Sequence, residues 1–293
     1  AFVNFEWNLT EKTKLVTGIR GEKVDYEYET NITPGTKGRI QVAPNRSDDF
    51  TEFSPKLAIN HKINDDLAIF ANLSRGNRAP QTTDLYRIQS KQIPGGAKSE
   101  KLDSFEIGLR GNFSIFNLEL VGFDMQKENY FFRDSQGFNV ENGKTTHRGF
   151  EVNFLIEFNQ FFQIENSSSF AEHEYDFDHS PNGIKSGNQI DSAPELLANT
   201  RLIFTPKERT RIELEWEKID SYPVDERNAH FYQGHDVFNL RTKMSINENI
   251  SIGIYVNNIT DKNYANRADF AFGSYRYFVG QKREVYLMLE SKF

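Results

Sequence analysis

Apolar and polar residues alternate with a period of two in about a dozen segments of this chain. In segment 250–257 one set of alternate positions is wholly branched and apolar: Ile250, Ile252, Ile254 and Val256. Successive side chains of a strand point to opposite faces, so each such segment predicts a β-strand with one apolar and one polar face. The same alternation occurs in 67–73, 105–109, 150–158 and 238–246. Helical spacing fits none of these segments as well.

The connections between the predicted strands alternate between short and long. Short connections are predicted near 10–13, 64–66, 114–115, 159–160, 206–209 and 247–249. Long connections rich in Gly, Pro, Asn, Asp and Ser are predicted over 30–51, 78–100, 133–147, 174–192, 223–235 and 260–280. A propeller blade of similar period would hold four shorter strands. Short turns on one rim and long loops on the other are typical of a transmembrane barrel, and the count comes to about 13 strands, ending with 281–293.

One predicted strand departs from regular alternation. Leu118 and Leu120 occupy even positions, whereas Val121, Phe123 and Met125 occupy odd ones. This change of parity predicts a β-bulge between Phe116 and Met125.

The polar faces of the predicted strands are densely charged, with both signs present. Glu106, Arg110, Glu151, Glu157 and Arg241 all fall on such faces. A wide, hydrated barrel lumen accounts for this pattern, and so does the solvated face of a soluble sheet. The alternation alone does not distinguish a hydrated barrel lumen from the solvated face of a soluble sheet.

Composition excludes several classes of function. The chain has no Cys, which excludes disulfides and thiolate chemistry. The net charge of -7 provides no broad basic surface for nucleic acid, and no nucleic-acid partner is expected. No Gly-x-Ser-x-Gly or His-Glu-x-x-His motif occurs, so we expect neither an enzyme nor a bound cofactor. The chain begins with Ala1 rather than Met, and we expect further strands to precede it in the parent protein.

Four segments, in order along the chain, resemble elements of the TonB-dependent receptors of the bacterial outer membrane. They are Arg78-Ala79-Pro80 with Asp84-Leu85-Tyr86, the segment 98–109, the segment 142–151 with Gly149 before Phe150-Glu151, and the segment 256–264 ending on Tyr264. The terminal Phe293 is similar to the aromatic end by which outer-membrane barrels are recognised for assembly. Independently of the family, Gly149 is expected to permit a close backbone approach.

The resemblance implies an all-β fold: an antiparallel transmembrane β-barrel meander, with residues 1–293 as the carboxyl-terminal portion of a 22-stranded barrel. The plug domain that fills such barrels is absent from the chain. The implied function is energy-coupled uptake of a scarce nutrient, most commonly a ferric siderophore or other iron complex. The implied partners are outer-membrane lipid and lipopolysaccharide, the chelate, and the TonB energy-transducing complex, reached through the plug. A passive diffusion barrel and a soluble β-sheet binding module remain the alternatives.

Three predicted loops hold candidate ligand-binding residues. Cations and aromatics suited to an anionic iron chelate are Arg78, Tyr86 and Arg87 in one loop and Arg227, His230 and Tyr232 in another. Packing at the barrel rim explains the same residues without a ligand. His173 and His179, among carboxylates, are candidate metal ligands, with an acidic solvated loop as the alternative. His61 and His147 fall within predicted strands, where we expect structural roles.

Overall fold

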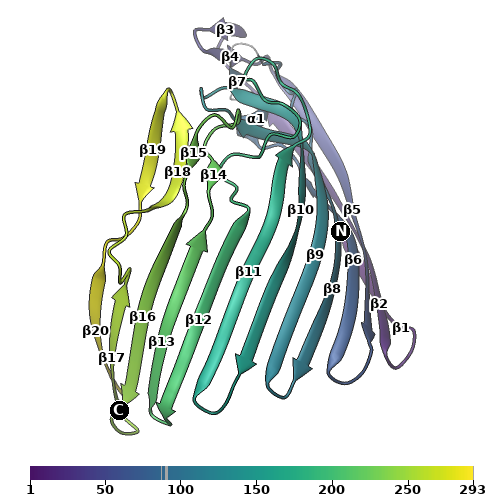
Figure 1. Ribbon diagram of the computed structural model, residues 1–293. Helices are drawn as coiled ribbons and strands as arrows, with labels where there is room; N and C mark the ends of the chain where they lie inside the picture. Colours follow the sequence, from purple (N-terminus) through teal and green to yellow (C-terminus); the bar gives the residue numbers. More distant parts are fainter. Residues whose placement is uncertain (87, 90–91, 293) are drawn as a thin grey trace.

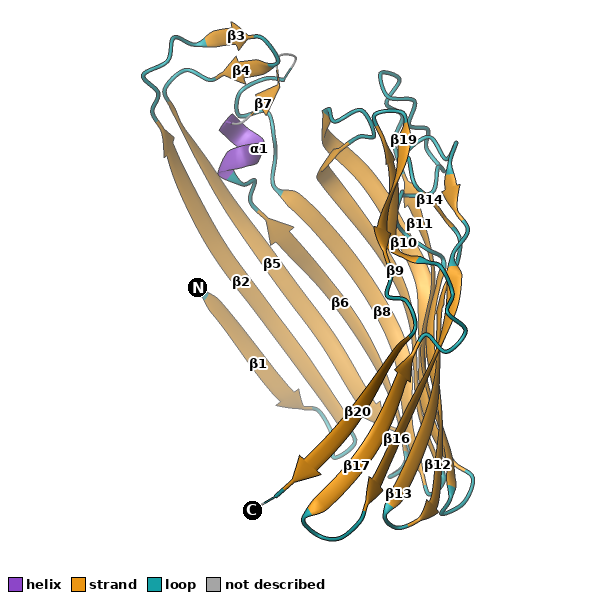
Figure 2. Ribbon diagram, turned by 90° about the vertical axis from the view of Figure 1, so that its left-hand side faces the viewer, coloured by secondary structure: helices purple, strands orange, loops and turns teal. Residues whose placement is uncertain are grey.

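A computed structural model describes residues 1–86, 88–89 and 92–292, and its main feature is one antiparallel sheet of 13 strands (Figure 1). The strands follow one another across the sheet in chain order, as expected for a meander. They are β1 (Phe2–Asn8), β2 (Thr13–Tyr28), β5 (Arg46–Lys62), β6 (Leu67–Arg78), β8 (Glu100–Phe113), β9 (Phe116–Arg133), β10 (Asn139–Glu157), β11 (Phe162–Tyr175), β12 (Leu196–Lys207), β13 (Thr210–Ile219), β16 (His235–Ser245), β17 (Ile250–Asn257) and β20 (Glu284–Ser291). The sheet is not closed: β1 and β20 form its two edges (Figure 2).

The six predicted short connections all join neighbouring strands at one end of the sheet (Figure 1). Three of them share one arrangement, in which the side-chain oxygen of an Asn accepts hydrogen bonds from the backbone N–H groups two and three residues later. Asn64 Oδ1 accepts from Asp66 and Leu67 at 2.9 and 2.8 Å, and Asn159 and Asn247 repeat the arrangement. Such turns satisfy the backbone locally, so the chain reverses within a few residues.

The long connections lie at the other end and carry the remaining elements. These are α1 (Thr82–Tyr86), a small sheet of β3 (Gly35–Lys37), β4 (Ile40–Val42) and β7 (Ile88–Gln89), and the pairs β14 (Tyr222–Pro223) with β15 (Phe231–Tyr232) and β18 (Ala265–Ala271) with β19 (Ser274–Val279). The prediction of a long loop over 133–147 is wrong. Strand β10 begins at Asn139 and pairs with β9 through register shifts near Gly143, which let the ladder continue past polar, Gly-containing sequence. In the described part of the chain, no helix is long and apolar enough to cross a membrane.

The two faces of the sheet differ in polarity. Helix α1 lies inside the arc of the sheet (Figure 2), and its cluster of Leu85 and Tyr86 packs against Tyr26, Tyr28 and Phe50. The residues that alternate with Phe50 on β5 point away from the arc, and they include exposed Phe53 and Leu57. The convex face is therefore apolar and the concave face polar, as in a membrane barrel whose lumen is hydrated.

The predicted β-bulge in β9 does not form. Residues 116–128 keep one continuous register with β8. Val121, Phe123 and Met125 consequently share the concave face with Glu119, while Asp124 lies on the convex face and accepts a 2.8 Å hydrogen bond from Arg148 Nε. The change of parity marks the upper edge of the apolar band, where the convex face becomes charged, rather than an inserted residue.

A charge on the convex face should destabilise the barrel wall. Leu287 is 83% exposed on this face and lies opposite Ile254 in the register, near the middle of the apolar band. Replacing Leu287 or Ile252 by Arg in the receptor that contains this chain should lower the free energy of unfolding by ~2–4 kcal/mol, measured by urea denaturation in lipid vesicles. Ser251→Arg, on the concave face, is the matched control and should change it by about 0.5 kcal/mol or less. Equal effects at convex and concave positions would contradict the membrane assignment.

Gly149 permits the close approach expected from the sequence. A Cβ at this position would lie 2.2 Å from the Phe170 carbonyl oxygen and 2.7 Å from the Ala171 Cα, both on the neighbouring strand β11. A side chain here would push β10 and β11 apart.

Gly149→Ala should therefore destabilise the wall by ~1–3 kcal/mol, the usual cost of overpacking. Gly76→Ala is the control, because an added Cβ there meets no atom within 4 Å. Thermal unfolding of both variants tests the difference. An unfolding midpoint of Gly149→Ala no lower than that of Gly76→Ala would show that β10 and β11 can move apart without loss of stability.

Candidate ligand-binding surface

The loop between β6 and β8 is anchored by a buried carboxylate. Glu100 accepts hydrogen bonds from Arg78 Nη2 at 2.7 Å, Lys127 Nζ at 3.0 Å and the Phe131 backbone N–H at 3.1 Å. Its side chain is only 8% exposed, so the two cations supply the compensation that a buried charge needs. Arg78, predicted as a ligand contact, fixes the base of this loop, and its contact with a ligand stays a prediction.

Tyr86 holds the same loop to the barrel wall. Its hydroxyl donates to Asp48 Oδ2 at 2.8 Å, and its ring stacks on Tyr28 with centroids 4.5 Å apart. Arg46 bridges Asp48 and the loop, donating to the Pro94 carbonyl at 2.5 Å. Burial, followed by the hydrogen bond to Asp48, raises the pKa of Tyr86 to about 12, so the phenol stays protonated and remains a donor. Arg87, the third predicted residue of this loop, lies outside the described residues.

Arg227, His230 and Tyr232 hold together a second group of loops, between β13 and β16. Arg227 Nε donates to the Asn182 carbonyl at 2.8 Å, which ties this loop to the one before β12. His230 is hydrogen-bonded to Asp225, and its ring stacks on Phe270 of β18 at 3.7 Å. Tyr232 accepts from the Ala265 N–H at 3.0 Å. Arg227, His230 and Tyr232 thus organise the loops, and their contact with a ligand stays a prediction.

The two predicted metal ligands have different partners. His173 lies opposite His147, with 2.8 Å between their Nδ1 atoms, whereas His179 is hydrogen-bonded to Asn182. Within the ranges that the structure describes, no group of three or more His, Cys, Asp or Glu side chains comes together to hold a metal ion. A site that joins His173 to His179 stays a prediction.

Four loops meet around a cavity of ≈ 290 Å³ that the sequence did not indicate. Its charged lining comprises Arg133, Arg267, Arg276, Asp134, Asp191, Glu226 and Asp269. Arg276 binds Asp269 through two hydrogen bonds, at 2.6 and 2.9 Å, and Ser135 donates to Glu226 through both its backbone N–H and its hydroxyl. Arg133 precedes Arg267 and Arg276 by more than 100 residues, and only the folded loops reveal that the three are neighbours.

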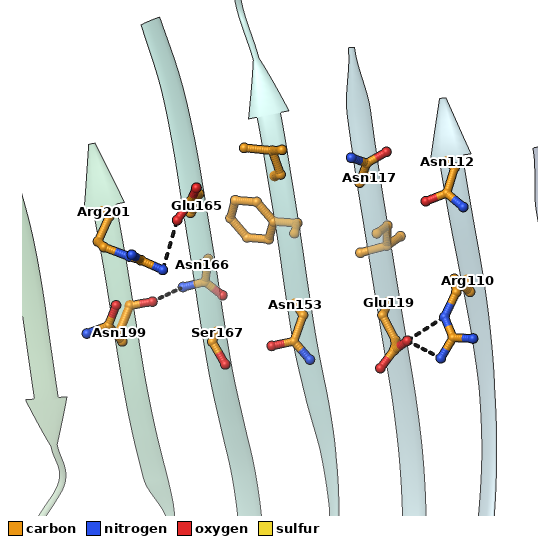
Figure 3. A pocket seen from close by; sticks show the side chains of 13 residues that line it. Arg110, Asn112, Asn117, Glu119, Asn153, Glu165, Asn166, Ser167, Asn199 and Arg201 are labelled. Carbon is orange, nitrogen blue, oxygen red and sulfur yellow. Dashed lines mark hydrogen bonds and ion pairs between the residues drawn. The ribbon is translucent and has the colours of Figure 1, made fainter. Parts of the chain in front are cut away.

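Below the loops, the concave face carries a ladder of polar side chains (Figure 3). Arg110 Nε donates to Glu119 at 2.6 Å, and Arg201 pairs with Glu165 at 2.8 Å. Asn153 and other amide and hydroxyl groups lie between these pairs (Figure 3). Cross-strand pairs of opposite charge thus line the concave side of the wall, where the polar faces of the predicted strands lie.

Comparison with known proteins identifies the family. The family model described as TonB dependent receptor-like, beta-barrel, matches residues 1–259. This chain belongs to the TonB-dependent receptors. The resemblance drawn from the four sequence segments is thereby confirmed, and the family consists of outer-membrane receptors and transporters rather than enzymes.

Solved structures share the fold at low sequence identity. The copper transporter OprC is 17% identical with a TM-score of 0.83, covering 100% of this chain and 47% of its own. The ferric citrate transporter FecA is 17% identical with a TM-score of 0.80, and the match covers 96% of this chain and 43% of FecA. The ferric yersiniabactin uptake receptor FyuA from Yersinia pestis is 15% identical with a TM-score of 0.76, and the match covers 100% of this chain and 45% of FyuA. The chain thus spans less than half the length of these structures. No curated protein matches it.

The packing of the loops of this TonB-dependent receptor should weaken as pH rises. Burial raises the pKa of Asp191 and of Glu226. The folded loops therefore bind more protons than the unfolded loops between the ordinary carboxyl pKa of about 4 and the raised values. The contribution of these two carboxyl groups to the stability of the folded loops is complete below that pH window. It is lost as pH rises through the raised pKa values.

Asp191→Asn should accordingly slow hydrogen exchange at the Ser192 amide, which donates to the Pro223 carbonyl at 2.9 Å, near pH 7 but not near pH 4. The Asn side chain keeps an acceptor for the Tyr175 hydroxyl, now 2.7 Å from Asp191. Glu208→Gln, at the exposed turn on the opposite rim, should change nothing at Ser192. Unchanged exchange in Asp191→Asn at both pH values would show that this carboxyl does not control the loops.

Proposed function

We propose that the chain forms the carboxyl-terminal part of a 22-stranded barrel that takes up a ferric siderophore or other iron complex by energy-coupled transport. The observation that carries this proposal is the cavity among the loops, which Arg133, Arg267 and Arg276 line together with four carboxylates. Planar guanidinium groups suit the carboxylate and catecholate oxygens of anionic chelates. Among proteins of the same fold, FyuA and FecA are described as taking up ferric yersiniabactin and ferric citrate.

The predicted residues fit this proposal as a framework around the cavity. Arg227 and His230 position the loop that contributes Glu226, and Tyr232 is bonded to the backbone where β18 begins. Arg78 and Tyr86 fix the loop on the other side of the opening. A chelate that enters between the two groups would contact exposed cations and aromatics from both.

The proposed setting is the outer membrane of a Gram-negative bacterium, which the chain crosses many times. On the convex face, ion pairs Arg75–Asp103, Arg148–Asp124 and Lys144–Glu128 follow directly above the apolar band. Such a charged belt suits the phosphates and bridging cations of lipopolysaccharide. Coupling to the TonB complex would occur through a plug outside this chain.

Arg133 provides the sharpest test of chelate binding. Within the described residues, the only hydrogen bond of its side chain is a long one, 3.4 Å from Nε to Asn139 Oδ1, so removal of the side chain should leave the loops folded. Arg133→Ala in the full receptor should raise the Kd of the bound ferric chelate ~10–100-fold, as expected for one charge-assisted hydrogen bond. Titration calorimetry against hydroxamate, catecholate and carboxylate iron complexes measures this change.

Arg209→Ala, at an exposed turn of the opposite rim, is the matched control and should bind as the parent does. Failure of every iron complex to bind would contradict the proposed ligand class. Solute permeation through receptor-containing vesicles without any energy source would instead favour the passive diffusion barrel.

A further inference from the structure

Two histidines face each other across neighbouring strands on the concave side of the wall. His147 of β10 and His173 of β11 are register partners, and their Nδ1 atoms lie 2.8 Å apart. Their ring planes are inclined by 59° with centroids 5.1 Å apart, so the rings meet edge to edge through nitrogen rather than by stacking. Both side chains are half-buried.

A contact of 2.8 Å between two ring nitrogens requires one to carry a proton and the other a lone pair. Thr145 Oγ1 lies 2.9 Å from His147 Nε2, and Thr145 is 2% exposed. When His147 donates its Nε2 proton to this hydroxyl, its Nδ1 lone pair points at His173. A single proton then lies between two nitrogens, a position that a metal ion can occupy instead.

A third donor lies beside the two histidines, in the row of register partners that runs across β9, β10 and β11. Met125 of β9 is the register partner of His147, on the side opposite His173. Register partners have Cβ atoms about 5 Å apart on one face, so the flexible thioether can reach the space beside the imidazoles. The next residues along these strands, Asp124 and Arg148, belong to the charged belt of the convex face, which places the row just above the apolar band.

We propose that Met125, His147 and His173 form a binding site for a soft d-block cation of the Cu⁺ type. A three-coordinate ion with bonds of about 2.0 Å to nitrogen separates two imidazole nitrogens by about 3.5 Å, so the rings need to open by about 0.7 Å. The His173 proton moves from Nδ1 to Nε2 when the ion enters, and both rings stay neutral. The thioether favours Cu⁺ over Zn²⁺, and Thr145 orients His147 as outer-shell partners of metal ligands commonly do.

This site is independent of the proposed uptake of iron chelates. It uses the concave wall below the loops and none of the arginines of the loop cavity. A receptor that binds no iron complex could still hold the cation, and the reverse is equally possible. The two proposals therefore fail separately.

The first experiment titrates the full receptor in detergent with Ag⁺, and with Cu⁺ under anaerobic ascorbate, against a chromophoric competitor. His147→Gln and His173→Gln should each lower the affinity about 100-fold or more, and Thr145→Val about 10–100-fold. Met125→Leu should weaken Ag⁺ and Cu⁺ while leaving the weaker binding of Zn²⁺ unchanged. His61→Gln, at the opposite end of the sheet, is the control and should bind as the parent does. Parent-like affinity in the double variant His147→Gln/His173→Gln would overturn the proposal.

X-ray absorption on the Cu⁺-loaded parent receptor needs no variant and covers the case in which the variants fail to assemble. Two imidazoles and one sulfur in the first coordination shell are expected. A shell without sulfur, or with a single imidazole, would overturn the assignment.

Discussion

The structure depends on the unbroken ladder of backbone hydrogen bonds between antiparallel strands. A lipid bilayer has no water to satisfy a peptide group, so each strand must find its partners in its two neighbours. In this chain the ladder runs through 13 strands in sequence order. At the two edges of this sheet, β1 and β20 each pair with one neighbouring strand within the described residues.

Once the ladder is formed, the period of two assigns every side chain to lipid or lumen. Leu287 and Leu289 are 83% and 73% exposed, values that would be costly in a soluble protein and are favourable against acyl chains. The concave side can hold charge because water and opposite charges share it, as Arg241 shows by binding both Glu213 and Glu215. Few side chains are fully buried, since the wall is a single layer between two solvents. The most compact packing occurs instead among the loops, around Leu85 and around Val224.

Local sequence predicted the parts of the fold that local physics determines. The short turns were predictable because Asn64, Asn159 and Asn247 close them with their own side chains. The strand faces followed from alternation. The bulge in β9 was wrongly predicted because pairing with both β8 and β10 holds residues 116–128 in register. The order of apolar and polar residues along one strand contains no information about its pairing with neighbouring strands. The loop over 133–147 was wrongly predicted because pairing with β9 extends β10 through sequence of low strand propensity.

The candidate sites were less predictable, because their chemistry arises between strands and loops rather than along them. Asp269 becomes part of a charged cavity only when β18 and β19 fold back beside the loop that contains Glu226. His147 shows the same point within the wall. In the sequence it is one histidine in a strand, for which a structural role is the simplest interpretation. The register of β10 with both neighbours places it between Met125 and His173, and a donor set appears that no spacing within a single segment would reveal. In a β-barrel, the unit of function is thus the row of residues across strands, so a sequence defines a site only together with its register.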